Sequence, residues 1–180
     1  FSGGFGLNAT YKGFDMSMFF NFMYDFDVLN ANKIMLTTWA DNKENNFLMD
    51  IASDKRWRNF DDMGNEIRYS PEVLAEFNKN ATMWNPTSIG RPICMSYAVE
   101  DGSFLRLNSA TLGYTLPSVW TKKVGLSKVR FYVSGNNLFT LTGYSGYDPE
   151  VNIATGLTPN IDYNRYPRSR TYTFGAQLTF

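Results

Sequence analysis

Apolar and polar side chains alternate along several segments of this chain with the period of two that is typical of half-buried β-strands. Between positions 14 and 26 every even residue is apolar, and most odd residues are polar. The same alternation occurs over 5–11, 129–133 and 171–180. The pattern predicts strands of about 10 to 14 residues, whereas strands of soluble sheets usually have five or six.

A tight hairpin is expected between the first two alternating runs. Lys12-Gly13 is a dipeptide that suits a two-residue turn, and closing the hairpin there pairs Tyr11 with Phe14. The pairs that follow along the two strands then bring apolar residues together on one face, so turn and pattern agree.

The alternation has a defect within 103–116. Apolar residues occupy odd positions before Asn108-Ser109 and even positions after it. A β-bulge would produce this slip. An apolar membrane band that begins only near Ala110 would produce it as well.

The connections between the expected strands differ greatly in length. The strands are expected at about 1–12, 14–26, 103–116, 128–141 and 169–180, and the long connections are 27–102 and 142–168. Long strands joined alternately by short turns and long loops are typical of outer-membrane β-barrels. Five strands cannot close a barrel, so they would belong to a larger one. A soluble β-sandwich with one buried face is the alternative.

Composition excludes several classes of protein. The 180 residues contain 17 basic and 17 acidic side chains, and this zero net charge argues against a nucleic-acid partner. No apolar run approaches the roughly 20 residues of a membrane-spanning helix. Histidine is absent, which removes Ser-His-Asp catalysis and the commonest zinc ligand. Cys94, the single cysteine, cannot form an internal disulfide.

Several segments resemble one family, the SusC/RagA-type TonB-dependent transporters of the bacterial outer membrane. The segments are EDGSFLRLNSATLGYTLP at 100–117, VRFYVSGNNLFTLTGYSGYDPEV at 129–151, IDYNRYPRSRTYTFGAQLTF at 161–180 and the opening 5–30. They cover about half of the chain in the family's order and spacing.

The resemblance implies an all-β fold, namely the last five antiparallel strands of a 22-stranded transmembrane β-barrel. The plug domain and the segment that contacts TonB would lie outside residues 1–180, so we expect a piece of a longer chain. The barrel's C-terminus would be periplasmic, which places 27–102 and 142–168 outside the cell as long loops containing short helices.

The resemblance also implies a function. The protein would import oligosaccharides or peptides across the outer membrane, together with a SusD-like surface lipoprotein and with energy delivered through TonB. A siderophore or cobalamin receptor without a lipoprotein lid is one alternative, and a soluble glycan-binding β-sandwich is another. No pair of carboxylates has the pattern of a glycosidase site, so we do not expect an enzyme.

The long loops hold the candidates for contact with substrate or partner. They are Trp57, Trp84, Tyr144, Tyr147, Asp148, Glu150 and Arg165. The aromatic rings could stack on sugars, but packing within the loop is the favoured interpretation for most of Trp39, Trp57, Trp84 and Tyr97. Asp148 and Glu150 could bind Ca²⁺ or sugar hydroxyls, although Asp-Pro-Glu is more typical of a turn, and no metal or cofactor is expected. A helix beginning at Pro71, with Ser70 as its N-cap, is predicted inside the first loop.

The last strand resembles the terminal signal that the barrel assembly machinery reads. The matching residues are Thr173, Gly175, Leu178 and Phe180. An exposed terminal strand can pair with the edge of a partner, which is the physical basis of such recognition. Phe180 would also be the final lipid-facing residue.

Overall fold

The computed structural model describes residues 1–38, 46–51, 54–88, 91, 93–150, 160–164 and 166–180. These residues form two compact units. One unit consists of Phe1–Val28 and Glu100–Phe180, and the other is Leu29–Val99.

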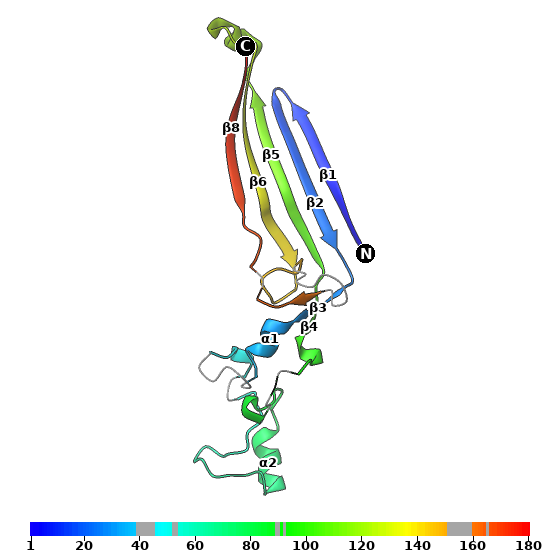
Figure 1. Ribbon diagram of the computed structural model, residues 1–180, viewed down its shortest axis with the longest axis vertical. Helices are drawn as coiled ribbons and strands as arrows, with labels where there is room; N and C mark the ends of the chain where they lie inside the picture. The colour runs from blue at the N-terminus through cyan, green and yellow to red at the C-terminus, as the bar shows by residue number, and fades with distance from the viewer. Residues whose placement is uncertain (39–45, 52–53, 89–90, 92, 151–159, 165) are drawn as a thin grey trace. The chain divides into compact units, whose positions relative to one another are not determined.

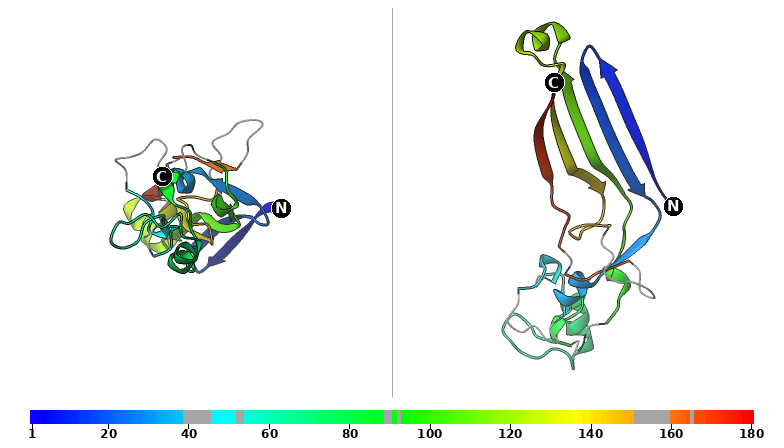
Figure 2. Two further views of the ribbon diagram at one scale, coloured as in Figure 1. Left: turned by 90° about the horizontal axis from the view of Figure 1, so that it is seen from below. Right: turned by 45° about the horizontal axis from the view of Figure 1, so that its top comes forward.

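A five-stranded antiparallel sheet makes up most of the first unit (Figure 1). Its strands are β1 (Ser2–Tyr11), β2 (Phe14–Met23), β5 (Phe104–Thr115), β6 (Lys128–Thr142) and β8 (Thr171–Thr179), in the order β1-β2-β5-β6-β8. They lie side by side in Figure 2 (right) as well. The all-β antiparallel fold predicted from the alternation is therefore confirmed.

The hairpin between β1 and β2 has the predicted register. Tyr11 pairs with Phe14, and the pairing continues without interruption to Ser2 and Met23. Lys12 and Gly13 both have positive φ, at 46° and 87°. A type I′ turn requires this conformation at both central residues, and it matches the twist of the two strands.

Register across the whole sheet separates an apolar face from a polar face. One row of paired residues is entirely apolar: Ala9, Met16, Leu112, Val133 and Phe174. The adjacent row is entirely polar: Asn8, Ser17, Thr111, Ser134 and Thr173. The two faces predicted from single strands therefore extend across all five.

The defect in 103–116 is a β-bulge. The register of β5 with its neighbours shifts between Leu107 and Ser109, and on β6 the same irregularity contains Asn137 with a positive φ of 53°. Because of the bulge, Leu107 rejoins the apolar face and pairs with Phe20 of β2. The bulge interpretation of the phase slip is thus confirmed.

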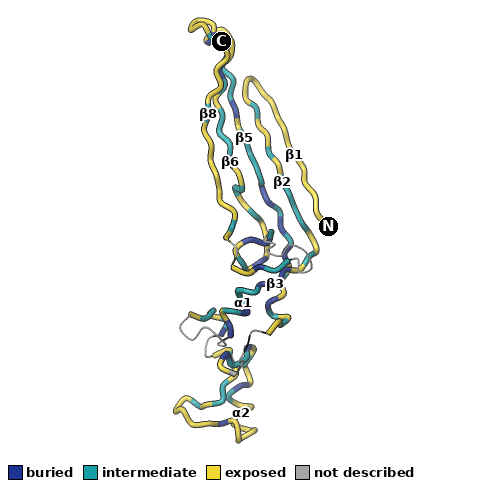
Figure 3. The backbone as a smooth tube through the Cα atoms, viewed as in Figure 1, coloured by how far each residue is buried: buried dark blue, intermediate teal, exposed yellow. Residues whose placement is uncertain are grey.

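The edge strands β1 and β8 have a neighbouring strand on one side only within the described residues, and almost all of their residues are exposed (Figure 3). Large apolar side chains of β8 are exposed, including Phe174 at 80%. A soluble sandwich would bury such side chains between two sheets, so this exposure argues against that alternative.

Strand β2 ends earlier than the alternation predicts. The expected strand reached Phe26, but β2 ends at Met23 and Asp25 adopts a positive φ of 61°. This left-handed conformation breaks the strand, and the chain continues into β3 (Asp27–Asn30). With β4 (Val99–Asp101) and β7 (Ile161–Asp162), β3 forms a second sheet in the order β4-β3-β7.

Short helices occur in the connections. The connection between β5 and β6 contains α3 (Ser118–Thr121) and the 3-10 helix η4 (Lys122–Val124). The second unit contains α1 (Ala31–Met35), α2 (Pro71–Asn78) and the 3-10 helices η1 (Met49–Ile51), η2 (Pro86–Ser88) and η3 (Ser96–Ala98). None of the helices that the structure describes is long and apolar enough to cross a membrane.

Helix α2 begins where the sequence predicts, with Ser70 at the N-cap and Pro71 in the first turn. Both parts of the prediction are confirmed, although the Ser70 side chain makes no capping hydrogen bond. The buried residue of the helix is Asn78, whose amide accepts from the Arg58 backbone N–H and donates to the Arg58 carbonyl at 2.9 Å. Asn78 therefore ties α2 to the chain segment beside it.

The two faces can be tested with adjacent residues of β6. In the membrane barrel that the sequence predicts, Val133→Arg should destabilise the fold by about 2–4 kcal/mol, because it places a charge on the lipid face near mid-strand. Ser134→Arg, at the same depth on the polar face, should cost much less. Urea unfolding of the full-length protein in lipid vesicles measures both free energies. Equal losses of unfolding free energy in the two variants would contradict the assignment of Val133 to the lipid face and Ser134 to the lumen face.

Candidate functional site

A buried arginine lies on the polar face of β5. Arg106 pairs in register with Asn21 of β2 and Thr140 of β6, and its side chain is only 2% exposed. Its guanidinium lies over the Phe104 ring, 5.5 Å from the ring centroid. A buried guanidinium requires compensation by carboxylates, because removal of a charge from water is costly.

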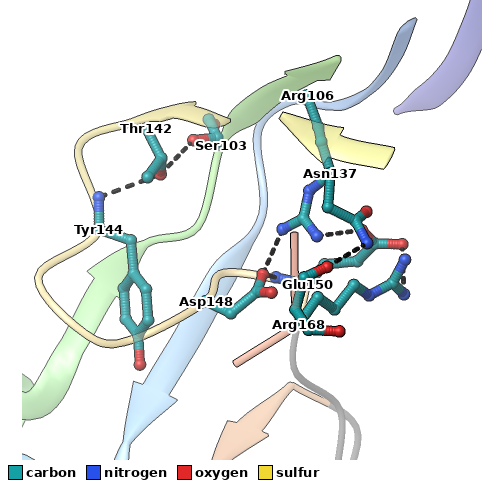
Figure 4. A network of polar contacts seen from close by, with 9 residues as sticks. Ser103, Arg106, Asn137, Thr142, Tyr144, Asp148, Glu150 and Arg168 are labelled. Atoms are coloured by element: carbon teal, nitrogen blue, oxygen red, sulfur yellow. Dashed lines mark hydrogen bonds and ion pairs between the residues drawn. The ribbon is translucent and has the colours of Figure 1, made fainter. Parts of the chain in front are cut away.

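Two carboxylates from the connection between β6 and β8 provide this compensation (Figure 4). Asp148 accepts a hydrogen bond from Nη2 of Arg106, and Oε2 of Glu150 lies 3.5 Å from Nη1. Glu150 also accepts a hydrogen bond of 3.0 Å from Arg168. Arginine and carboxylate therefore alternate along a chain of four side chains, which we call the arginine–carboxylate network.

The segment that carries Asp148 is held in place by hydrogen bonds of its own. The Thr142 hydroxyl donates to the Ser103 carbonyl at 2.8 Å and accepts from the Tyr144 N–H at 3.1 Å (Figure 4). Ser145 donates to Glu100 from both its backbone and its hydroxyl. These contacts fold the chain back over the end of β6 toward Arg106.

Tyr144 is a buried anchor of the same segment. Its hydroxyl donates to Asp162 at 2.8 Å. Burial and, after it, this carboxylate raise the pKa of the Tyr144 phenol well above its usual range, so the phenol stays a donor. Gly146 lies directly against the ring, since a Cβ there would be 2.5 Å from its Cζ.

A cavity of about 270 Å³ adjoins the network. Its lining includes Arg106, Asn137, Thr140, Tyr147, Asp148, Arg168 and Arg170. Two buried polar atoms among these residues have no hydrogen-bond partner within the described structure, namely Nε of Arg106 and Oδ1 of Asn137. The cavity therefore combines charge with unused hydrogen-bonding capacity.

The structure separates the sequence-predicted candidates of this loop. Asp148 and Glu150 are brought together, but arginines engage their carboxylates and Glu150 also donates its N–H to Asp148 at 3.0 Å. The turn interpretation of Asp-Pro-Glu agrees with this geometry. Tyr147 is 74% exposed and borders the cavity, whereas Arg165 lies outside the described residues.

The tryptophans of the second unit differ in their surroundings. Trp84 packs edge-on against Tyr97 with ring centroids 5.2 Å apart, and its indole N–H donates to the Thr37 carbonyl at 3.1 Å. Trp57 is 41% exposed and lines a hollow of about 420 Å³ together with Phe60. Trp84 is thus partly buried and Trp57 lies at the surface of the unit, while Trp39 is outside the described residues.

A second ion pair crosses the polar face of the sheet. Arg130 of β6 reaches Asp15 of β2 over the intervening strand β5, and its Nε donates to Oδ1 of Asp15 at 2.9 Å. Gly113 of β5 lies beneath the pair, where a Cβ would be 2.6 Å from the same carboxylate oxygen. Only glycine leaves room for this contact.

The residues proposed as the assembly signal lie on or next to the edge strand β8. Thr173 pairs with Ser134 on the polar face, and Leu178 pairs with Val129 on the apolar face. Gly175 lies against the Tyr132 ring, since a Cβ would be 2.5 Å from the phenol oxygen. Phe180 is 88% exposed beyond the end of the strand.

Sequence reasoning missed Arg106, Arg168 and Asp162 as members of the site. Arg106 carried a signal, because it stands between Leu105 and Leu107 and so marks a polar-face position inside an apolar strand. Its partner Asp148 is 42 residues away, and no local pattern links the two.

Within the described residues no group of three His, Cys, Asp or Glu side chains is arranged to hold a metal ion. Oδ1 of Asp148 and Oε1 of Glu150 accept hydrogen bonds from Arg106 and Arg168.

Comparison with known proteins identifies the family. No protein-family model matches the chain. TonB-dependent receptor P3 of Formosa agariphila is 34% identical over 186 residues, covering the whole chain. TonB-dependent receptor SusC of Bacteroides thetaiotaomicron is 38% identical over 88 residues, or 47% of the chain.

Solved structures of the RagAB peptide importer match 99% of the chain and 17% of the matched chain. The open-open state has a TM-score of 0.71 at 26% identity, and the closed-closed state 0.72 at 25%. The chain belongs to the SusC/RagA family of TonB-dependent receptors.

Members of this family are β-barrel proteins of the bacterial outer membrane, so the five-stranded sheet of this receptor segment is part of a barrel wall. The soluble sandwich is thereby excluded. The segment spans 16% of the length of receptor P3 and 8% of that of SusC.

The arginine–carboxylate network of this receptor can be tested at Asp148. Asp148→Asn keeps the side-chain shape but leaves Arg106 without its nearest counter-charge. Removing one partner of a buried pair costs about 3–5 kcal/mol, so the segment 143–150 should open. Hydrogen exchange of these amides in the full-length protein measures the opening.

The matched control is Glu76→Gln, which breaks the exposed pair with Lys79 and should cost at most about 1 kcal/mol. The double variant Arg106→Met/Asp148→Leu should recover part of the protection, because it removes both members of the buried pair and leaves Glu150 paired with Arg168. Exchange in Asp148→Asn no faster than in Glu76→Gln would contradict the assigned role.

Proposed function

We propose that the full-length protein imports oligosaccharides or peptides across the outer membrane, with energy delivered through TonB. The main support for this proposal is that the similarity to the TonB-dependent receptors extends over the whole chain. The solved relatives are described as a peptide importer, which supports a substrate of this size. The family consists of receptors, which supports transport in place of catalysis.

The barrel of the full-length protein is proposed to have 22 strands, with a plug domain and the TonB-contacting segment elsewhere in the chain. In this arrangement, Lys12-Gly13 and 117–127 face the periplasm. The connections 27–102 and 142–168 then face the cell exterior. The network around Arg106 lies at that outer end, on the face turned toward the lumen.

A SusD-like surface lipoprotein is the proposed partner. The supporting observation is the second unit, Leu29–Val99, which interrupts the sheet between β2 and β5 as a compact body with its own interior. Ordering this many residues costs about 1–2 kcal/mol each in backbone entropy, and a plain pore has no use for it. A receptor that binds a lipoprotein can offset this entropy cost, because a stable protein–protein interface buries about 1,600 Å² of surface.

The alternative within the same transport class is a siderophore or cobalamin receptor without a lipoprotein. Such a receptor would not copurify with a lid. The outcome of a pull-down with the full-length protein therefore discriminates between the two.

Replacing the second unit tests the proposed role. Because β3 and β4 are neighbours in one sheet, a short Gly/Ser linker from Asn30 to Val99 should remove the unit without cutting the large sheet. We expect a folded barrel that no longer retains the lipoprotein and takes up substrate poorly. Heat-modifiable gel mobility checks folding, while copurification and uptake check the function.

A linker of similar composition inserted at Gly125, in the connection between β5 and β6, is the control and should leave both readouts unchanged. If the protein without the second unit still held its lipoprotein and transported normally, the assignment would be wrong.

The barrel assembly machinery is the second proposed partner, reading Thr173, Gly175, Leu178 and Phe180. Phe180 supports this role because it is almost fully exposed and contributes little packing. Its deletion should lower the amount of full-length receptor in the outer membrane. Tyr172→Ala, which trims another exposed ring of the same strand, should have a smaller effect. Surface labelling measures both, and unchanged levels after the deletion would rule the signal out.

A further inference from the structure

The cavity beside the arginine–carboxylate network has more positive than negative charge. Three arginines line it, namely Arg106, Arg168 and Arg170. Two carboxylates oppose them, namely Asp148, which lines the cavity, and Glu150, which pairs with Arg106 and Arg168. One positive charge is therefore left over.

Within the described residues, no further carboxylate of the surrounding loop lines the cavity. Between positions 143 and 170 the acidic residues are Asp148, Glu150 and Asp162. The first two belong to the network, whereas Asp162 accepts the hydrogen bond from Tyr144 and is not among the lining residues of the cavity. Arg170 makes no ion pair within the residues that the structure describes, and its side chain is exposed.

Hydrogen-bonding capacity is left over as well. Arg106 is 98% buried, yet its Nε has no hydrogen-bond partner in the described structure. Buried guanidinium N–H groups are normally satisfied, because an unmade bond to a charged group costs more than one to a neutral group. A network that served only to hold the loop would have no reason to leave this donor unused.

We propose that the cavity binds a carboxylate group of the transported molecule. Planar guanidinium groups match carboxylates in geometry and can donate two parallel hydrogen bonds. Thr140 and Tyr147 lie in the same lining and add a polar and an aromatic residue to it. This proposal rests on the proposed function, since it takes the ligand to be the substrate.

The size of the cavity restricts what enters. About 270 Å³ is below the usual 300–1,000 Å³ of pockets that enclose a whole small molecule. One terminal residue of a longer chain fits this volume. The carboxylate is therefore either the C-terminus of a peptide or the acid group of a uronate sugar.

Binding of matched acid and neutral probes to the purified full-length protein tests the proposal. The probes are trialanine with its C-terminal amide, and digalacturonic acid with its dimethyl ester. Isothermal titration should show at least one free acid binding about tenfold more tightly than its neutral counterpart. A preference for the peptide acid or for the uronate identifies the source of the carboxylate.

Arg170→Gln should abolish most of this preference, because it removes the unpaired charge at the cavity without touching the buried pair. Lys123→Gln removes one positive charge at the opposite end of the strands, from η4, and should leave the preference intact. Equal affinity for acid and neutral probes, or an undiminished preference in Arg170→Gln, would overturn the proposal.

Uptake of the same probes by cells separates this proposal from the proposed function. If cells imported the acid and neutral probes at equal rates and the protein bound them with equal affinity, the proposed transport function would be supported and the carboxylate site excluded. If the protein bound the acid probes more tightly but cells imported none of the probes, the carboxylate site would be supported and transport of these molecules excluded.

Discussion

The backbone of a strand surrounded by lipid can satisfy its N–H and C=O groups only through the strands beside it. Every other property of the large sheet is compatible with this requirement. The strands are long, the pairing from β1 to β8 is continuous apart from the bulge, and the side chains are divided between two faces. The open edges at β1 and β8 have the same origin, because a segment of barrel wall needs neighbours on both sides.

The bulge shows how a regular wall accommodates an irregular site. One extra residue on β5 and the left-handed Asn137 on β6 let the apolar face continue on both sides of the defect. On the polar face the same irregularity leaves room for a returning loop, and the Asn137 amide donates to the Ser169 carbonyl. Arg106 lies two positions from the bulged residue, where its guanidinium meets the carboxylates of that loop.

Much of the sheet could be predicted from the sequence, because alternation and turn chemistry are local. The pairing of Tyr11 with Phe14 and the phase slip near Asn108 followed from neighbouring residues alone, whereas the structure was needed to identify the slip as a bulge. The site could not be predicted in this way. Arg106 and Asp148 are joined only by the fold, and the identity of Tyr144 did not distinguish a buried anchor from an exposed platform. The early end of β2 at Asp25 was missed because the apolar alternation continued past it.

The ion pair between Asp15 and Arg130 has a further consequence for how the wall is built. It joins two strands that are not neighbours, so it can close only after β5 has taken its place between them. A slip of β5 by one residue would put Leu112 or Tyr114 in the place of Gly113, and either side chain would fill the space that the pair crosses. The ion pair therefore forms only when β5 has its native register, and in forming it stabilises that register over a slipped one.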